Sequence, residues 1–386
     1  MKIDEPWLHS PATRKLCDAL TSAGAEIYFV GGCVRNALLG EPVSDLDLST
    51  SATPQYVTEA AEQAGLKVIP TGIEHGTVTV VVDGDPFEIT TFRRDVATDG
   101  RRAVVAFATE ILEDARRRDF TMNALYARPT GEIVDPLSGF EDLKARRVRF
   151  IGDATRRIQE DYLRILRYFR FHSWYGDAEA GFDPEALAAI AAMQEGLDHL
   201  SRERVGAEIM KLLSSPNPAP SVATMRQIGV LAHVLPGADD RALAPLVYLE
   251  ADLPAEAETR LAALGGEDLQ NTLRLSKASA ARVALLRTLA TGTATAAEIA
   301  YRQDADTAKR AMMLRSALLE MPVLPHLESD IALGAVAEFP ISAKDLMPHV
   351  QGAALGRALK TLEAEWIRSG FQSDRETLLK RLSDLN

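Results

Sequence analysis

The periodicity of the apolar residues changes once along the chain, close to Leu143. Before that point, short apolar runs such as Ile27 to Val30 and Val78 to Val82 alternate with segments of helical period. After it, strand signals fade, and a helical period rich in Ala, Leu, Glu and Arg continues to the end. The pattern predicts an α+β fold, in which an N-terminal α/β head is followed by an extended all-helical neck, body and tail.

The length of 386 residues is more than one ordinary hydrophobic core accommodates. We therefore expect three parts: a catalytic head over residues 1–145, a helical neck over residues 146–215, and a helical body and tail over residues 216–386. The boundary between head and neck is expected near Arg146.

The composition excludes several classes of protein. The segment from Met1 to Lys15 has no apolar run, and no apolar stretch is long enough to span a bilayer, so we expect neither a secretory signal nor a membrane segment. Only two cysteines occur, Cys17 and Cys33, which argues against a disulfide framework or a cysteine-rich zinc site. These features predict a protein of a reducing compartment, the cytoplasm.

The charge is unevenly distributed. The net charge is −12, yet nine of the basic residues lie between Lys144 and Arg170, and the acidic excess lies elsewhere, as in Glu250 to Asp268. Binding depends on the local field rather than on the average. An RNA or nucleotide partner is therefore compatible with the sequence if it meets the basic stretch.

One ordered set of residues points to chemistry. A predicted strand, Ile27 to Val30, is followed by Gly31-Gly32, then a short helix to Gly40, then Asp45-Leu46-Asp47-Leu48 on a second strand. Alternate side chains of a strand share a face, so Asp45 and Asp47 are expected side by side, where a divalent cation such as Mg²⁺ would relieve their repulsion. Glycines let backbone N–H groups approach phosphate oxygens closely.

The individual pieces have simpler explanations. An aspartate pair is often a solvated strand edge, and Gly-Gly before a helix is often only a turn. Arg35 lies one turn further on, within reach of a triphosphate. Glu88, on a later predicted strand, either supplies a third carboxylate or is a surface residue. The order of the pieces is what favours a metal-dependent phosphoryl-transfer site, with Asp45 and Asp47 as catalytic metal ligands.

This set resembles the polymerase-β-like nucleotidyltransferases, and within them the class II CCA-adding enzymes and bacterial poly(A) polymerases. The segment from Arg117 to Ala124 resembles the family's second motif, which implies that Arg118 and Asn123 bind the nucleotide. The segment from Asp135 to Leu143 resembles the motif that joins head and neck. Together, the resembling motifs cover about the first half of the chain.

The segment from Glu160 to Phe171 has a clear helical period. Four of its charged residues recur at every third position and would form one stripe: Asp161, Arg164, Arg167 and Arg170. One interpretation is an exposed helix with weak ion pairs. The other is that three neighbouring arginines need an anion over them, which favours a binding surface.

The family resemblance implies the second interpretation. In the resembling enzymes, this aspartate and the first arginine act as a protein template for the incoming base. A carboxylate accepts from an amino group and a guanidinium donates to a ring acceptor, a pattern that cytosine and adenine match and uracil and guanine reverse. The resemblance implies that Asp161 and Arg164 select CTP and ATP, and that Arg167 and Arg170 steady phosphate. Leu200 to Arg204 resembles a neck motif that braces this helix, or is only a capped helix start.

The implied activity is template-independent addition of CCA to the 3′ end of tRNA. Pro70 to Val80 resembles the CCA-adding branch more than the poly(A) branch. Poly(A) polymerase or A-only addition is the alternative, and a catalytically silent RNA-binding protein is the alternative from another class. The family usually has Asp where this chain has Asn36, which puts one positioning contact in doubt. The stretch from Arg93 to Phe107 is predicted to be a mobile loop that moves when the pocket changes from C to A.

Overall fold

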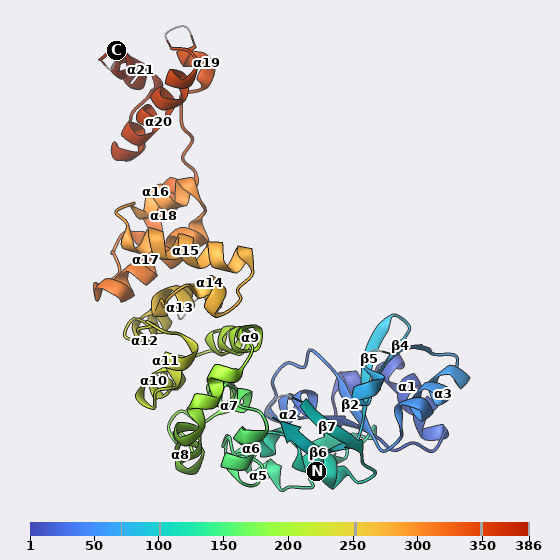
Figure 1. The fold of residues 1–386 in the computed structure, drawn as a ribbon. Helices are drawn as coiled ribbons and strands as arrows, with labels where there is room; N and C mark the ends of the chain where they lie inside the picture. The colour runs from blue at the N-terminus through green and yellow to red at the C-terminus, as the bar shows by residue number, and fades with distance from the viewer. Residues whose placement is uncertain (71, 100–101, 251–252, 348–349, 385–386) are drawn as a thin grey trace. The chain divides into compact units, whose positions relative to one another are not determined.

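The computed structural model describes the whole chain except residues 71, 100–101, 251–252, 348–349 and 385–386 (Figure 1). The chain forms two compact units, one of residues 1–236 with 271–274 and the other of residues 237–270 with 275–386. In the described residues, strands occur only as far as Val134, and every later element is a helix. The predicted α+β class, with a mixed head followed by helices, is therefore confirmed. The division into three parts stays a prediction.

The first unit contains a seven-stranded mixed sheet. Its strand order is β3-β4-β5-β2-β1-β8-β9, and β2 and β5 run parallel while the other neighbours are antiparallel. The strands are β1 (Ile27–Val30), β2 (Asp47–Thr50), β3 (Lys67–Ile69), β4 (Thr77–Val82), β5 (Asp85–Thr91), β8 (Tyr126–Ala127) and β9 (Ile133–Val134). The parallel pair places the start of β2 next to the middle of β5.

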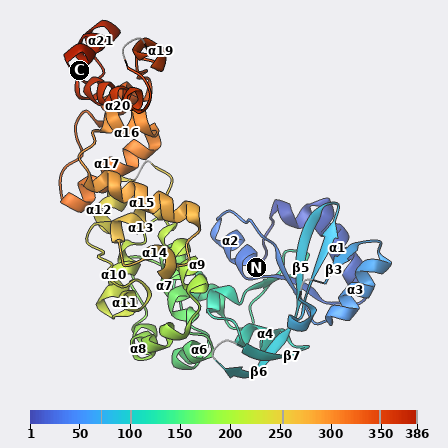
Figure 2. The same ribbon diagram turned by 45° about the horizontal axis from the view of Figure 1, so that its top comes forward.

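Two helices, α1 (Pro11–Ser22) and α3 (Pro54–Gln63), lie side by side against the sheet beside β4 (Figure 2). The side chain of Ser10 accepts from the N–H of Thr13 and caps α1. Helix α2 (Gly32–Leu39) ends at Gly40, whose left-handed conformation (φ 71°) suits glycine. Short 3₁₀ turns occur at Pro6–His9 and Ile73–His75.

The predicted mobile loop between Arg93 and Phe107 is wrong as a description of the backbone. This stretch forms a hairpin of β6 (Arg93–Asp99) and β7 (Arg102–Phe107), with a bulge between Asp95 and Ala97. An alternating strand pattern is hard to recognise when four of the seven residues of β6 are charged. The turn itself, at residues 100–101, lies outside the described residues.

Helices complete the first unit. They are α4 (Ile111–Arg116), η3 (Thr121–Asn123), α5 (Gly139–Lys144), α6 (Ala154–Glu160), α7 (Leu163–Tyr175), α8 (Pro184–Met193), η4 (Gln194–His199), α9 (Arg202–Leu213), α10 (Ala219–Gln227) and α11 (Val230–Val234). Phe120 and Phe150 pack on Tyr168 and Phe171 of α7, with ring centroids 5.1–6.2 Å apart. This aromatic cluster fixes α7 against the end of the head.

The continuous helix predicted from Glu160 onward is broken. Helix α6 ends at Glu160, Asp161 has an extended backbone (φ −158°, ψ 105°), and α7 begins at Leu163. The apolar period continues across this corner, which is why periodicity alone does not reveal it. Asp161 therefore lies at a corner between two helices and is not part of a helical stripe.

The second unit is entirely helical in its described residues. Its helices are α12 (Leu243–Leu249), α13 (Ala257–Leu264), α15 (Lys277–Thr291), α16 (Ala296–Arg302), α17 (Ala305–Leu319), α18 (Leu327–Ala335), α19 (Ala343–Leu346), α20 (Ala353–Arg368) and α21 (Arg375–Asp384), and α14 (Leu269–Thr272) crosses the division along the chain. Leu362 and Trp366 of α20 pack with Leu346 and Leu378 to hold the last three helices together. No helix in the described part of the chain has the length and apolar character needed to cross a membrane.

Candidate active site

Two of the three predicted carboxylates are brought together by the sheet. Asp47 is the first residue of β2 and is the register partner of Glu88 on β5, so their side chains leave the sheet on the same face. The next residue, Leu48, is buried on the other face. Asp45 lies just before the strand, and its carboxylate accepts from the Ser44 hydroxyl at 2.9 Å. Strand alternation therefore places Asp47 and Glu88, whereas the loop before β2 places Asp45.

The pKa of Asp47 shows that these carboxylates interact. Burial raises it above the ordinary aspartate value, Glu88 and Asp45 raise it further, and Arg118 lowers it. Negative charges that disfavour each other's ionisation are relieved by a divalent cation, and an all-oxygen donor set suits Mg²⁺. In the described residues, no group of three or more His, Cys, Asp and Glu side chains is arranged to hold a metal ion. The carboxylates of Asp45 and Asp47 leave coordination places for phosphate oxygens and water, which is the oxygen donor set that Mg²⁺ prefers. The residues present therefore fit this cofactor.

The glycine pair sits at the start of α2. Gly31 has φ 72°, a conformation that favours glycine, and a Cβ there would come within 3.4 Å of a guanidinium nitrogen of Arg118. The first N–H groups of α2 have no partner within the helix, as at any helix start. This arrangement can present backbone donors to an anion beside Arg118.

These residues share a cavity of about 450 Å³. Its lining includes most of the predicted site: Gly31, Gly32, Arg35, Asp47, Arg118, Asn123, Asp161, Arg164 and Arg167. Asp45, Glu88 and Arg170 are not among its lining residues. The lining also contains residues that the sequence did not single out for the site, namely Arg117, Asp119, Leu163 and Phe171, together with Arg204.

Arg35 is a buried cation held by neutral groups. It donates to Asn123 Oδ1 at 2.6 Å, to the Tyr175 hydroxyl at 2.8 Å and twice to Asn36 Oδ1, and it is only 7% exposed. It makes no ion pair with a carboxylate of the described residues. A buried charge without a counter-charge is costly, so an anion entering the cavity would be stabilised by it. Burial lowers the pKa of Arg35.

Arg118 is held by groups outside the predicted site. It donates to Asp114 at 3.0 Å and to the Tyr126 hydroxyl at 3.1 Å, while Arg117 donates to the other oxygen of Asp114. Burial alone would raise the pKa of Asp114, but Arg118 and Arg117 together lower it to about 2. One carboxylate thus binds two guanidinium groups, so the three side chains together keep a net positive charge that can attract an anionic ligand.

The low pKa of Asp114 predicts a pH-dependent contribution to stability. Because the folded-state pKa is about 2 and the ordinary value is 3.8, the contribution is complete above about pH 5 and is lost as the pH falls. The shift corresponds to about 2 kcal/mol in all, of which about 1 kcal/mol is lost by about pH 3. Urea unfolding at about pH 5 and at about pH 3 measures the free energy of unfolding of the wild type and of Asp114→Asn. The advantage of the wild type should be smaller by about 1 kcal/mol at the lower pH. An advantage that does not change with pH would contradict the prediction.

The charged stripe is neutralised by the protein itself. Arg164 donates to Glu160 at 2.7 Å, Arg167 to Asp119 at 2.5 Å, and Arg170 to Glu208 at 2.7 Å. The inference that the three arginines need an external anion is therefore wrong. Asp119 and Glu208 are 48 and 38 residues away from the arginines they bind, so the helical period could not reveal them.

Asp119 connects this stripe to Arg35. Its second oxygen accepts from Asn123 Nδ2 at 2.9 Å, and the amide oxygen of Asn123 accepts from Arg35. Arg167 shares this chain of hydrogen bonds, whereas Arg170 packs over the Phe171 ring and points to Glu208. Arg170 is thus placed to support α7.

Asp161 and Arg164 are held in fixed positions. One oxygen of Asp161 accepts from Arg204 of α9 at 2.6 Å, and the other accepts from the N–H of Leu163. Arg164 donates to the carbonyl oxygens of Arg157 and Arg117 as well as to Glu160. The predicted brace from the Leu200 to Arg204 segment is therefore present as the bond between Arg204 and Asp161.

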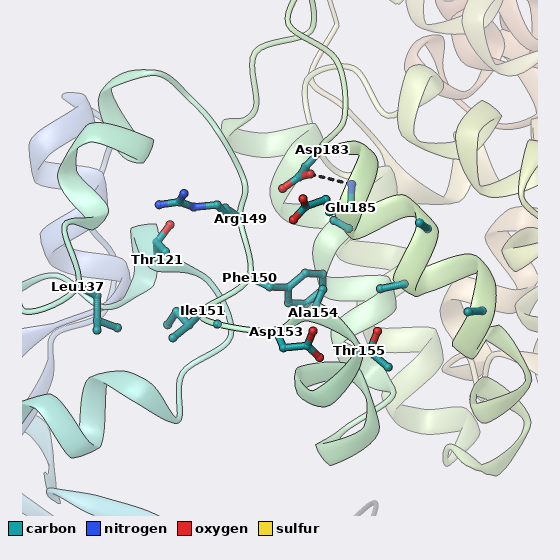
Figure 3. Close-up of a pocket in the computed structure, with 15 residues that line it drawn as sticks. Thr121, Leu137, Arg149, Phe150, Ile151, Asp153, Ala154, Thr155, Asp183 and Glu185 are labelled. Atoms are coloured by element: carbon teal, nitrogen blue, oxygen red, sulfur yellow. Dashed lines mark hydrogen bonds between the residues drawn. The ribbon is translucent and has the colours of Figure 1, made fainter.

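A larger cavity of about 770 Å³ lies at the junction with α8 (Figure 3). Phe150 and Ile151 line it together with alanines of α8, and Asp183 caps that helix by accepting from the N–H of Glu185. It contains none of the predicted site residues. The smaller cavity is the candidate active site because Asp47, the buried Arg35 and the glycine pair all line it.

The mixed sheet with Asp47 and Glu88 on neighbouring central strands, together with the arginine-lined cavity, is the arrangement of a nucleotidyltransferase, and comparison with known proteins agrees. Residues 27–149 match the model of the poly A polymerase head domain, and residues 181–241 match the model described as the probable RNA and SrmB-binding site of polymerase A.

Known enzymes resemble the chain over nearly its whole length. The mitochondrial CCA tRNA nucleotidyltransferase 1 of Danio rerio is 34% identical over 375 residues, which cover 93% of this chain and 87% of that protein. The CCA-adding enzyme of Limosilactobacillus fermentum is 31% identical and covers 100% of this chain and 99% of its own. The crystal structure of the Bacillus stearothermophilus CCA-adding enzyme in complex with CTP superposes with a TM-score of 0.75 at 28% identity, covering 97% and 98% of the two chains. The chain belongs to the family of CCA tRNA nucleotidyltransferases.

Proposed function

We propose that this protein adds cytidine, cytidine and adenosine in turn to the 3′ end of tRNA, from two CTP and one ATP, without a nucleic-acid template. The family membership supports the activity. The observation that carries the proposal is one cavity that joins Asp47 and the buried Arg35 to Asp161 and Arg164. Chemistry and base choice can therefore act on the same nucleotide.

The reaction is a displacement at the α-phosphorus. The oxygen of the tRNA 3′ hydroxyl forms a bond to this phosphorus, the bond to the bridging oxygen of the β-phosphate breaks, and pyrophosphate leaves with the electron pair. The hydroxyl proton passes to solvent. Asp45 and Asp47 would hold Mg²⁺, and Glu88 adds negative charge beside them. Bound Mg²⁺ supplies Lewis-acid stabilisation of the charge that develops on the attacking and leaving oxygens.

The cationic wall of the cavity positions the triphosphate. Arg35 makes no direct ion pair with a carboxylate of the described residues, and the N-terminus of α2 supplies backbone donors next to Gly31 and Gly32. Arg118 is oriented by Asp114 and Tyr126, while Asn123 is oriented by Asp119. Fixed donors cost no reorganisation when the reaction proceeds.

Base selection falls to the corner between α6 and α7. Asp161 can accept from the exocyclic amino group of cytosine or adenine, and Arg164 can donate to the adjacent ring acceptor. The bonds from Arg164 to two carbonyl oxygens and Glu160 hold its guanidinium plane. Uracil and guanine would place an acceptor toward the carboxylate and a donor toward the guanidinium, which leaves both pairs unmatched.

The remaining parts of the proposal concern the partner and the compartment. The helical residues 216–386 would contact tRNA, the neck of residues 146–215 would carry base selection, and the enzyme would act in the cytoplasm.

A transfer assay tests the activity. Labelled CTP and ATP are supplied with Mg²⁺ and a tRNA that lacks its last three nucleotides. We expect two cytidines and then one adenosine to be added, after which extension stops. Continued addition of adenosine would indicate a poly(A) polymerase, adenosine without cytidine would indicate an A-adding enzyme, and no addition would favour a silent RNA-binding protein.

A further inference from the structure

The corner between α6 and α7 that carries Asp161 also contains the aromatic side chain of Tyr162. Tyr162 lies between Asp161 and the first residue of α7, and its backbone carbonyl accepts from the N–H of Ile165 at 3.1 Å. Asp161 and Tyr162 are adjacent, so a displacement of the Tyr162 ring is transmitted to the Asp161 carboxylate through one peptide unit.

The ring of Tyr162 packs directly on Gly196 of η4. A Cβ at Gly196 would lie only 2.0 Å from Cδ1 and 2.4 Å from Cγ of that ring. Real carbon atoms in contact are about 3.5–4.0 Å apart. The backbone of Gly196 does not have the positive φ that favours glycine. Glycine is therefore required here by the ring and not by the backbone conformation.

Contacts with other elements hold η4 in place, so we expect the Tyr162 ring to move rather than η4. Helices α8 and α11 pack against η4. The His233 ring nitrogen lies 3.0 Å from the Asp198 carboxylate. A Cβ at Gly229, just before α11, would come within 2.6 Å of the Gln194 side chain. These contacts hold η4 near both of its ends, so its position beside the Tyr162 ring is fixed.

We propose that Gly196 is a positioning residue for base selection, because its bare backbone lets the Tyr162 ring settle where Asp161 reaches both Arg204 and the incoming base. This inference rests on the proposed role of Asp161. Displacing the ring to an ordinary contact distance needs about 1.5 Å, whereas the 2.6 Å bond from Arg204 to Asp161 tolerates only a few tenths of an ångström.

The test is the variant Gly196→Ala. We expect its ratio of CTP to UTP incorporation to fall by about tenfold or more, while binding of the shortened tRNA stays within about twofold of the wild type. The control is Asp85→Ala, at an exposed position at the start of β5 and outside the residues proposed to bind nucleotide or tRNA. That variant should keep the wild-type ratio.

A second substitution tests the route through the ring. Tyr162→Ala removes the atoms that the new Cβ would strike, so the double variant Gly196→Ala/Tyr162→Ala should recover part of the selectivity lost by Gly196→Ala. A double variant no better than the single one would overturn the role of the ring. If Gly196→Ala fails to fold by circular dichroism, Tyr162→Ala alone decides, since loss of the ring should also lower the ratio.

The outcomes separate this inference from the proposed function. Asp161→Ala is measured in parallel. If Asp161→Ala loses selectivity and a folded Gly196→Ala keeps it, the positioning role of Gly196 is refuted while the role of Asp161 stands. If Asp161→Ala itself keeps selectivity, the proposed base selection fails, and the inference fails with it.

Discussion

Asp47→Ala and Asp45→Ala are expected to abolish nucleotide transfer, with a fall in rate of about a thousandfold or more, while binding of the shortened tRNA persists. Removing one metal ligand forfeits several kcal/mol of charge stabilisation in the transition state, and about 4 kcal/mol corresponds to about a thousandfold. Asp47 carries the clearer expectation because β2 and β5 hold it beside Glu88. Single-turnover incorporation of labelled CTP at saturating nucleotide measures the rate, and filter retention of labelled tRNA measures binding.

Two further variants show whether the loss is specific. Asp47→Asn keeps the size of the side chain and removes its charge, so it should be nearly as inactive as Asp47→Ala. Asp85→Ala removes an exposed carboxylate from the first residue of β5, which pairs with Val82 of β4 and not with β2, and should retain the wild-type rate. Transfer by Asp47→Ala within about tenfold of the wild type would overturn the assignment of the metal site.

Asp161→Ala and Arg164→Ala should relax base choice without stopping transfer. Each matched contact to a base edge is worth about 1–3 kcal/mol, so we expect the CTP-to-UTP ratio to fall by roughly 5- to 150-fold. The expectation differs between the two residues. Asp161→Ala leaves Arg204 without its acceptor, whereas Arg164→Ala leaves Glu160 still paired with Arg157. We therefore expect Asp161→Ala to lose more stability as well as selectivity.

Arg156→Ala is the matched control for this pair. Arg156 is on α6, also near Glu160, but its side chain is 78% exposed, and it is not among the residues that line the cavity. The Arg156→Ala substitution removes one positive charge from α6 and should leave the CTP-to-UTP incorporation ratio unchanged. Wild-type selectivity in both Asp161→Ala and Arg164→Ala would refute the proposed template.

Features that depend on neighbouring residues could be predicted from the sequence. The strand from Ile27 to Val30, the helix start at Gly32 and the cap at Ser10 all follow local period and turn chemistry, and the structure has each of them. The hairpin between Arg93 and Phe107 and the corner at Asp161 were missed. In the first case charges obscured the alternation, and in the second the apolar period continued through a break in the backbone.

By itself, the sequence determined which chemical groups this protein has and their order: a glycine pair, two aspartates and a run of arginines. Only the tertiary structure decided which of those charges are available. The fold places Asp47 beside Glu88 on parallel strands. It pairs Arg167 with Asp119 and Arg170 with Glu208, and it surrounds Arg35 with neutral hydrogen-bond partners. The physical reason is that Coulomb energies depend on separation and burial. Chain folding sets both quantities for groups that lie tens of residues apart.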